Sequence, residues 1–70
     1  MTTTDVPVAD LAREHNTTTA RVLEVADTII GRVVRDCGAD AARGLTTRPG
    51  PGGTVRLTAP LADLVREHFA

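Results

Sequence analysis

Three side chains in this 70-residue sequence could act as nucleophiles, bases or metal ligands in addition to its carboxylates: His15, Cys37 and His68. Catalytic pairs and metal sites usually need two or more such groups at a short, defined spacing, such as Cys-x-x-Cys or His-x-x-x-His. None of the three has such a neighbour. The histidines are explained more simply as residues near helix ends, and we expect Cys37 to be buried. The sequence therefore predicts no enzyme activity, no metal and no cofactor.

The arginines offer a different chemistry. All eight basic residues are arginine, and the guanidinium group suits contacts with phosphate and guanine. The net charge of −1 argues against nucleic acid at first, because DNA-binding proteins usually have a basic footprint. However, residues 41–60 contain Arg43, Arg48 and Arg56 and no acid, whereas residues 1–40 contain four arginines and seven acids. Such a basic segment on a weakly acidic body can still bind DNA if it reaches the backbone.

Two amphipathic segments within residues 8–25 predict a helix-turn-helix. Each segment has three apolar residues at the i, i+3, i+4 spacing of one helical face. They are Val8, Leu11 and Ala12 in the first segment, and Val22, Val25 and Ala26 in the second. Between them, Asn16 can adopt the left-handed conformation that ends a helix, and one of the threonines at 17–19 can cap the next. An ordinary helical hairpin is the alternative interpretation.

The first helix is expected to begin at Asp5 or Val6, with Pro7 in its first turn and His15 near its end. Proline suits a first-turn position because its missing N–H would have no partner there. Residues 1–5 are expected to form a flexible N-terminus, and residues 6–70 a single small domain.

The second helix is expected to run from about residue 18 to residue 36 or 37 and to stop at Gly38. Its apolar residues fill an arc of about 180°. A domain this small needs a narrower stripe to cover one core, so we expect a partner to cover part of the arc, most simply in a homodimer. The residues expected at that dimer contact are Leu23, Ile30 and Val34.

The second half of the chain predicts a β-hairpin followed by a helix. Threonines and branched residues on both sides of the Pro/Gly segment 49–53 favour two strands joined by a turn. Pro60 and the apolar stripe that follows it predict a final helix with Thr58 as its cap. Its sequence LADLVREH nearly repeats VADLAREH of residues 8–15. A duplication or a shared compositional bias would both produce this similarity.

Taken together, a helix, a turn, a long helix, a hairpin and a final helix resemble the winged helix-turn-helix group, particularly its excisionase-like and MerR-like DNA-binding domains. The fold class implied is mainly α with a small hairpin, namely three helices and a two-stranded wing. Two positions depart from the usual pattern: Asn16 stands in place of the commoner glycine, and Thr17 where an apolar residue often packs. The second helix also has extra turns, so the position of the hairpin relative to the DNA groove is an open question at this stage.

The resemblance implies double-stranded DNA as the partner, with the start of the second helix in the major groove and the hairpin on the phosphate backbone. The residues implied at the base edges are Thr18, Thr19, Arg21 and Thr28. The residues implied at the backbone are Arg43, Arg48 and Arg56. Arg21 is the strongest single candidate for a base contact.

Two classes of function remain from the sequence. One is a transcriptional regulator or a recombination-directionality factor. The other is a small protein-binding adaptor, such as a phage or plasmid accessory module, that uses the broad apolar face of the long helix. No apolar run approaches the roughly 20 residues of a membrane span, and the first residues lack the basic start of a signal peptide, so a cytoplasmic location is expected.

Overall fold

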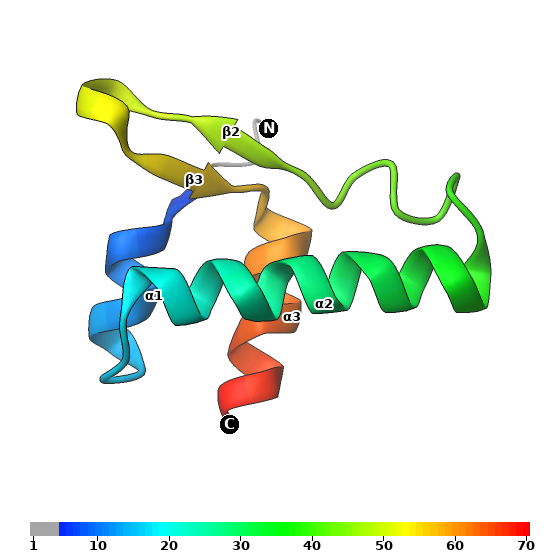
Figure 1. Ribbon diagram of the computed structural model, residues 1–70, viewed down its shortest axis with the longest axis horizontal. Helices are drawn as coiled ribbons and strands as arrows, with labels where there is room; N and C mark the ends of the chain where they lie inside the picture. The colour runs from blue at the N-terminus through cyan, green and yellow to red at the C-terminus, as the bar shows by residue number, and fades with distance from the viewer. Residues whose placement is uncertain (1–4) are drawn as a thin grey trace.

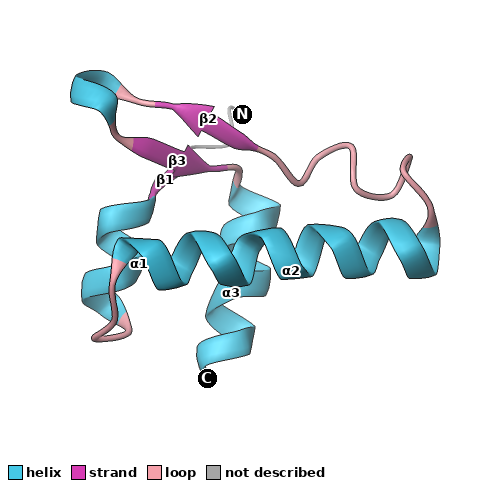
Figure 2. Cartoon of the chain, viewed as in Figure 1, coloured by secondary structure: helices cyan, strands magenta, loops and turns pink. Residues whose placement is uncertain are grey.

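The computed structural model describes residues 5–70. These residues form three helices and a small antiparallel sheet, and this arrangement is compatible with a winged helix fold (Figure 2). In chain order the elements are β1 (Val6–Pro7), α1 (Val8–Glu14), α2 (Thr19–Cys37), β2 (Thr47–Pro49), the 3-10 turn Pro51–Gly53, β3 (Val55–Leu57) and α3 (Ala59–Phe69). Apart from Asp5, the N-terminal segment expected to be flexible lies outside the described residues.

The predicted turn between the first two helices is confirmed. Asn16 adopts the left-handed conformation with φ 55°, and the N–H of Thr17 donates to the carbonyl of Ala12 at 2.8 Å. Thr18 has extended backbone angles and caps α2, because its Oγ1 accepts a hydrogen bond from the Arg21 N–H at 3.2 Å. These local interactions end one helix and start the next within a few residues.

The hairpin is also confirmed, but it belongs to a three-stranded sheet with the order β1-β3-β2. The expectation that the first helix begins at Asp5 or Val6 is wrong. Val6 and Pro7 form β1, which pairs antiparallel with β3 so that Val6 lies opposite Leu57. A residue before proline is disfavoured in the helical conformation, and Val6 is β-branched, so both biases support an extended backbone here. Pro7 is therefore the extended residue that precedes α1, and not part of its first turn.

The core lies where the three helices meet the inner face of the sheet. In Figure 1, α2 crosses in front of α1 and α3, and the sheet covers the ends of α1 and α3. The largest fully buried side chains come from all of these elements. They are Leu11, Val22, Leu57, Leu61 and Val65.

The last turns of α2 reach beyond this core (Figure 1). The helix ends at Gly38, whose φ is 92° and whose N–H donates to the carbonyl of Val34 at 2.9 Å. Cys37, at the end of the helix, is exposed, so the expectation that it is buried is wrong. The projection of α2 past α3 explains this, because no helix of residues 5–70 lies behind its final turn (Figure 1).

After Gly38 the chain runs back above the C-terminal half of α2 towards the sheet (Figure 1). This return segment, residues 38–46, contains four backbone hydrogen bonds between residues three apart, as in successive tight turns, and buries Ala42 and Leu45. Thr58 holds its end in place, because the threonine Oγ1 donates to the Gly44 carbonyl at 2.7 Å and accepts from the Thr46 N–H at 3.3 Å. Thr58 precedes α3 as predicted, but its hydroxyl bonds to the return segment and not to the helix.

Candidate nucleic-acid interface

The beginning of α2 presents a polar surface to solvent. Thr18, Thr19, Arg21 and Thr28 are all exposed. Arg21 forms an ion pair with Glu24 one turn later, with 2.7 Å between Nη1 and Oε1. The hydroxyl of Thr28 donates to the Glu24 carbonyl at 3.0 Å. This surface therefore displays hydroxyl groups and one guanidinium group, which are side chains that contact base edges and phosphates in DNA complexes.

On the hairpin, the strand register places Arg48 directly opposite Arg56. Side chains alternate between the two faces of a strand, and the neighbouring Leu57 is fully buried against the helices. Both arginines therefore lie on the outer face of the sheet. Arg48 is 3.4 Å from the carboxylate of Asp5, whereas the Nε of the half-buried Arg56 has no hydrogen-bond partner among the described residues. Two like charges in opposite positions repel, so an anion near this pair would be favourable.

The hairpin tip lies beside the first turns of α2. The sequence alone did not predict this position, because α2 has extra turns before the hairpin begins. A groove of about 440 Å³ separates the two elements, and residues from both line it, together with the start of α1. From the helices these residues are Val8, Ala9, Thr19 and Leu23, and from the hairpin Pro51, Gly53, Thr54, Val55 and Arg56; Pro7 completes the lining. The return segment explains the proximity, because it brings the chain back along α2 before the hairpin begins (Figure 1).

Arg43 does not belong to this arrangement. It lies in the return segment, with 84% of its side chain exposed, and its Nη2 is 3.4 Å from the Asp40 carboxylate. Among the described residues, no hydrogen bond or ion pair joins Arg43 to the hairpin or to the start of α2. Of the seven residues named from the sequence, Thr19 on α2 and Arg56 on the hairpin line this groove. Arg21 lies two residues before the groove-lining Leu23, so it is on the opposite side of α2 from the hairpin.

The ion pairs at these arginines do not prevent contact with a phosphate. Arg21, Arg43 and Arg48 each have a carboxylate within 4 Å, and the arginine side chains are between 49% and 84% exposed. Exposed pairs contribute between about 0 and 1 kcal/mol, because water and salt screen them. A polyanion that offers several phosphates at once can therefore replace the carboxylates.

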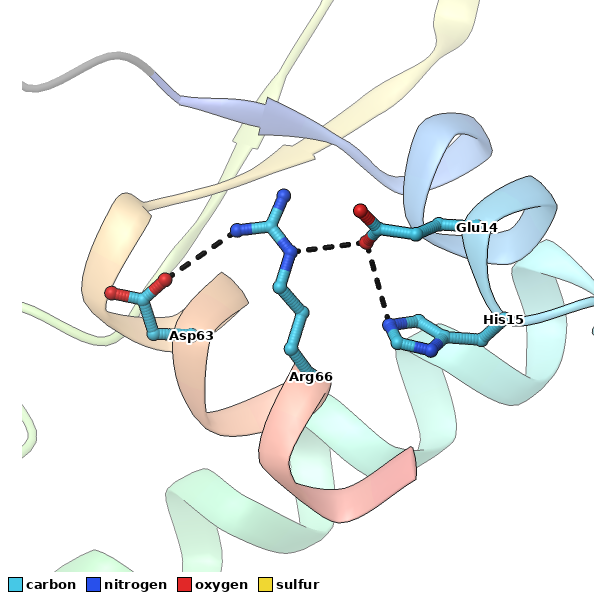
Figure 3. A network of polar contacts seen from close by, with 4 residues as sticks. All are labelled: Glu14, His15, Asp63 and Arg66. Atoms are coloured by element: carbon cyan, nitrogen blue, oxygen red, sulfur yellow. Dashed lines mark hydrogen bonds and ion pairs between the residues drawn. The ribbon is translucent and has the colours of Figure 1, made fainter. Parts of the chain in front are cut away.

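A second polar cluster joins the end of α1 to α3 (Figure 3). The Nε of Arg66 donates to Glu14 Oε2 at 3.0 Å, and its Nη1 to Asp63 at 3.4 Å. The hydrogen bond to Glu14 is the main reason why the pKa of Arg66 is raised above its usual value, with smaller contributions from both carboxylates and against the effect of burial. The imidazole of His15 lies 3.4 Å from the same Glu14 oxygen and stacks on Phe69, with the ring centres 5.1 Å apart. This cluster links the two segments of near-repeated sequence and fixes the turn against α3.

Two further properties of the described residues concern ligands and membranes. They contain no group of three or more His, Cys, Asp and Glu side chains that could hold a metal ion. Within the same part of the chain, no helix has the length and apolar character needed to cross a membrane.

Comparison of the chain with protein-family models, with curated proteins and with solved structures gives no match in any of the three cases.

Proposed function

We propose that this protein binds double-stranded DNA through the start of α2 and the hairpin. The observation that carries the proposal is the position of the hairpin tip beside the first turns of α2. A winged helix-turn-helix uses these two elements together, one in the major groove and the other on the adjacent backbone. The confirmed turn at Asn16 and the cap at Thr18 support the same interpretation.

In this proposal α2 reads the bases. Its first turns enter the major groove, where Thr18, Thr19 and Arg21 reach the base edges and Thr28 lies further along the helix. Arg21 leaves Glu24 and makes a bidentate contact with a guanine. The exposed ion pair costs no more than about 1 kcal/mol to break, whereas a bidentate contact contributes about 1 to 3 kcal/mol of base discrimination.

The hairpin contacts the phosphate backbone of the DNA. Arg48 and Arg56 contact phosphates, which fixes the orientation of α2 without reading sequence. The repulsion between the two opposed guanidinium groups is relieved when a phosphate lies near them. Arg43 contributes a weaker, longer-range attraction from the return segment.

A DNA-binding domain of this size, similar to the excisionase-like and MerR-like domains, acts as a transcriptional regulator or a recombination-directionality factor. Its place of action is the cytoplasm, and it reads paired half-sites as a homodimer. The alternative of a protein-binding adaptor rests on the wide apolar arc of α2. Most of that arc packs against the core of the same chain, and Val34, at 42%, is the exposed large hydrophobic residue among those described. The observation therefore favours DNA over the adaptor function.

The test begins with selection of binding sites from a random DNA library by the wild-type protein. The Arg21→Ala variant is then titrated against the selected sequence and its single-base variants. We expect an affinity loss of about 1 to 3 kcal/mol and a relaxed preference at one base position. Arg13→Ala is the matched control, because Arg13 is exposed and lies on α1, outside the reading surface of α2. Unchanged base preference in a folded Arg21→Ala protein would remove this residue from the reading surface, and no selection of sequence by the wild type would reject the proposal.

A further inference from the structure

A glycine in the middle of α2 has no role within the chain itself. Gly31 is helical and exposed, and a Cβ built on it would meet nothing within 4 Å. Glycine is the least favourable helix residue apart from proline, because the unfolded chain loses most entropy there. The absence of a side chain allows another backbone to approach closely. Nothing in the described residues uses this space at Gly31, so it is open to a second molecule.

Opposite charges lie at equal distances on either side of this glycine. Asp27 and Arg35 are four residues before and after Gly31, so all three lie along one face of the helix. Both charged residues are exposed, and neither belongs to an ion pair of the described residues. They are eight residues apart, about 12 Å along the helix axis, which is too far for contact with each other. Val34, the exposed large hydrophobic residue, borders the same face.

We propose that a second copy of this chain packs on this face, with the two α2 helices antiparallel and crossing at Gly31. Antiparallel crossing places each Asp27 next to Arg35 of the partner, whereas a parallel pair would bring like charges together. The missing side chains at the crossing allow the two backbones to approach closely. The contact differs from the stripe expected from the sequence, because Leu23 lines the groove below the hairpin and Ile30 packs against the core.

The pairing also sets the distance between the two Arg21 residues, which can be compared with the distance between half-sites on DNA. This step rests on the proposed function. Arg21 precedes Gly31 by ten residues, which is about 15 Å of helix. In the antiparallel pair the two Arg21 residues are then about 30 Å apart, near the roughly 34 to 36 Å between half-sites one turn apart on DNA. Arg21 projects about 80° around the helix from Gly31. A two-fold axis perpendicular to both helices therefore places both Arg21 side chains on one side of the pair.

A single helix crossing buries less surface than a stable dimer needs, so we expect weak self-association in free solution. Sedimentation of the full chain over a concentration series, without DNA, measures it directly. Asp27→Arg alone and Arg35→Asp alone each turn two attractive pairs into two repulsive ones, and we expect each to weaken association about 5-fold or more. The double variant Asp27→Arg/Arg35→Asp restores both pairs with reversed signs, so its association returns to within about 2-fold of the wild type.

Two further variants separate packing from folding. Gly31→Leu fills the crossing, so it should abolish association while raising the melting temperature of the monomer, because leucine is the better helix residue. Arg32→Asp changes charge by the same amount on another side of α2 and should leave association unchanged. A wild-type protein that stays monomeric at the highest concentration, or a double variant as weak as the singles, overturns the proposal. If the protein is strictly monomeric and Arg21→Ala still loses base preference, this pairing and the reading of paired half-sites are rejected, whereas DNA recognition through α2 stands.

Discussion

Replacing Thr58 by valine removes one hydroxyl while keeping the shape of the side chain, and we expect it to destabilise the fold measurably. Thr58 is 8% exposed. Its Oγ1 makes the two hydrogen bonds that fix the return segment, to the Gly44 carbonyl and from the Thr46 N–H. Each lost bond costs about 1 kcal/mol net, and more where the backbone group left behind cannot reach water. The expected loss is therefore about 2 kcal/mol, or roughly 8 to 16 °C in melting temperature for a domain of this size.

Thermal and urea denaturation followed by circular dichroism measure this loss. Thr28→Val is the matched control: its hydroxyl also donates to a backbone carbonyl, but from the exposed surface of α2. We expect the control to differ from wild type by no more than about 0.5 kcal/mol. In Thr58→Val, hydrogen exchange should also become faster at the Thr46 amide. A Thr58→Val protein as stable as the control would refute the role given to this hydroxyl.

Two other substitutions test the turns that position the candidate interface. Gly50→Ala places a Cβ 2.5 Å from Thr54 Oγ1, so we expect a loss of about 1 to 2 kcal/mol in thermal denaturation. Gly44→Ala meets nothing within 4 Å and should be nearly neutral; equal melting temperatures for the two variants would contradict the close approach at the hairpin tip. Asn16→Ala forces a side chain into the left-handed conformation and should cost about 1 kcal/mol, whereas Asn16→Gly should be neutral or stabilising. A glycine variant less stable than the alanine variant would show that this turn is held by something other than backbone angle.

The helices could be predicted from the sequence because their signals are local. The cap at Thr18, the left-handed Asn16 and the stop at Gly38 each act on residues within a turn or two. The hairpin was equally clear, because threonines and branched residues surround a Pro/Gly turn. For the same reason the start of the long helix near Thr18 could be predicted.

The features that were missed depend on residues far apart in the chain. The strand at Val6 also needs β3 beside it, although Pro7 and the β-branched side chain of Val6 already favour an extended backbone. Cys37 is exposed because α2 extends past α3. The periodicity of apolar residues along α2 predicts which side of the helix is apolar, but not how far the neighbouring helix reaches. The position of the hairpin depends on the path of the return segment, and a succession of tight turns has no periodic pattern that would predict this path. The near-repeat is visible in the sequence, but the ion pair between its two copies, from Arg66 to Glu14, depends on how α1 and α3 pack in the folded chain.

The most direct test of DNA binding by the hairpin and α2 is the salt dependence of affinity. Fluorescence anisotropy with a selected DNA duplex is measured over a salt series for the wild type and for the double variant Arg48→Ala/Arg56→Ala. If both arginines contact phosphates, the slope of log affinity against log salt falls by about 0.9 for each lost contact, and every DNA sequence is weakened alike. Parallel lines for the two proteins would contradict the role of the hairpin, and a wild-type protein that binds no duplex at low salt would contradict DNA binding altogether.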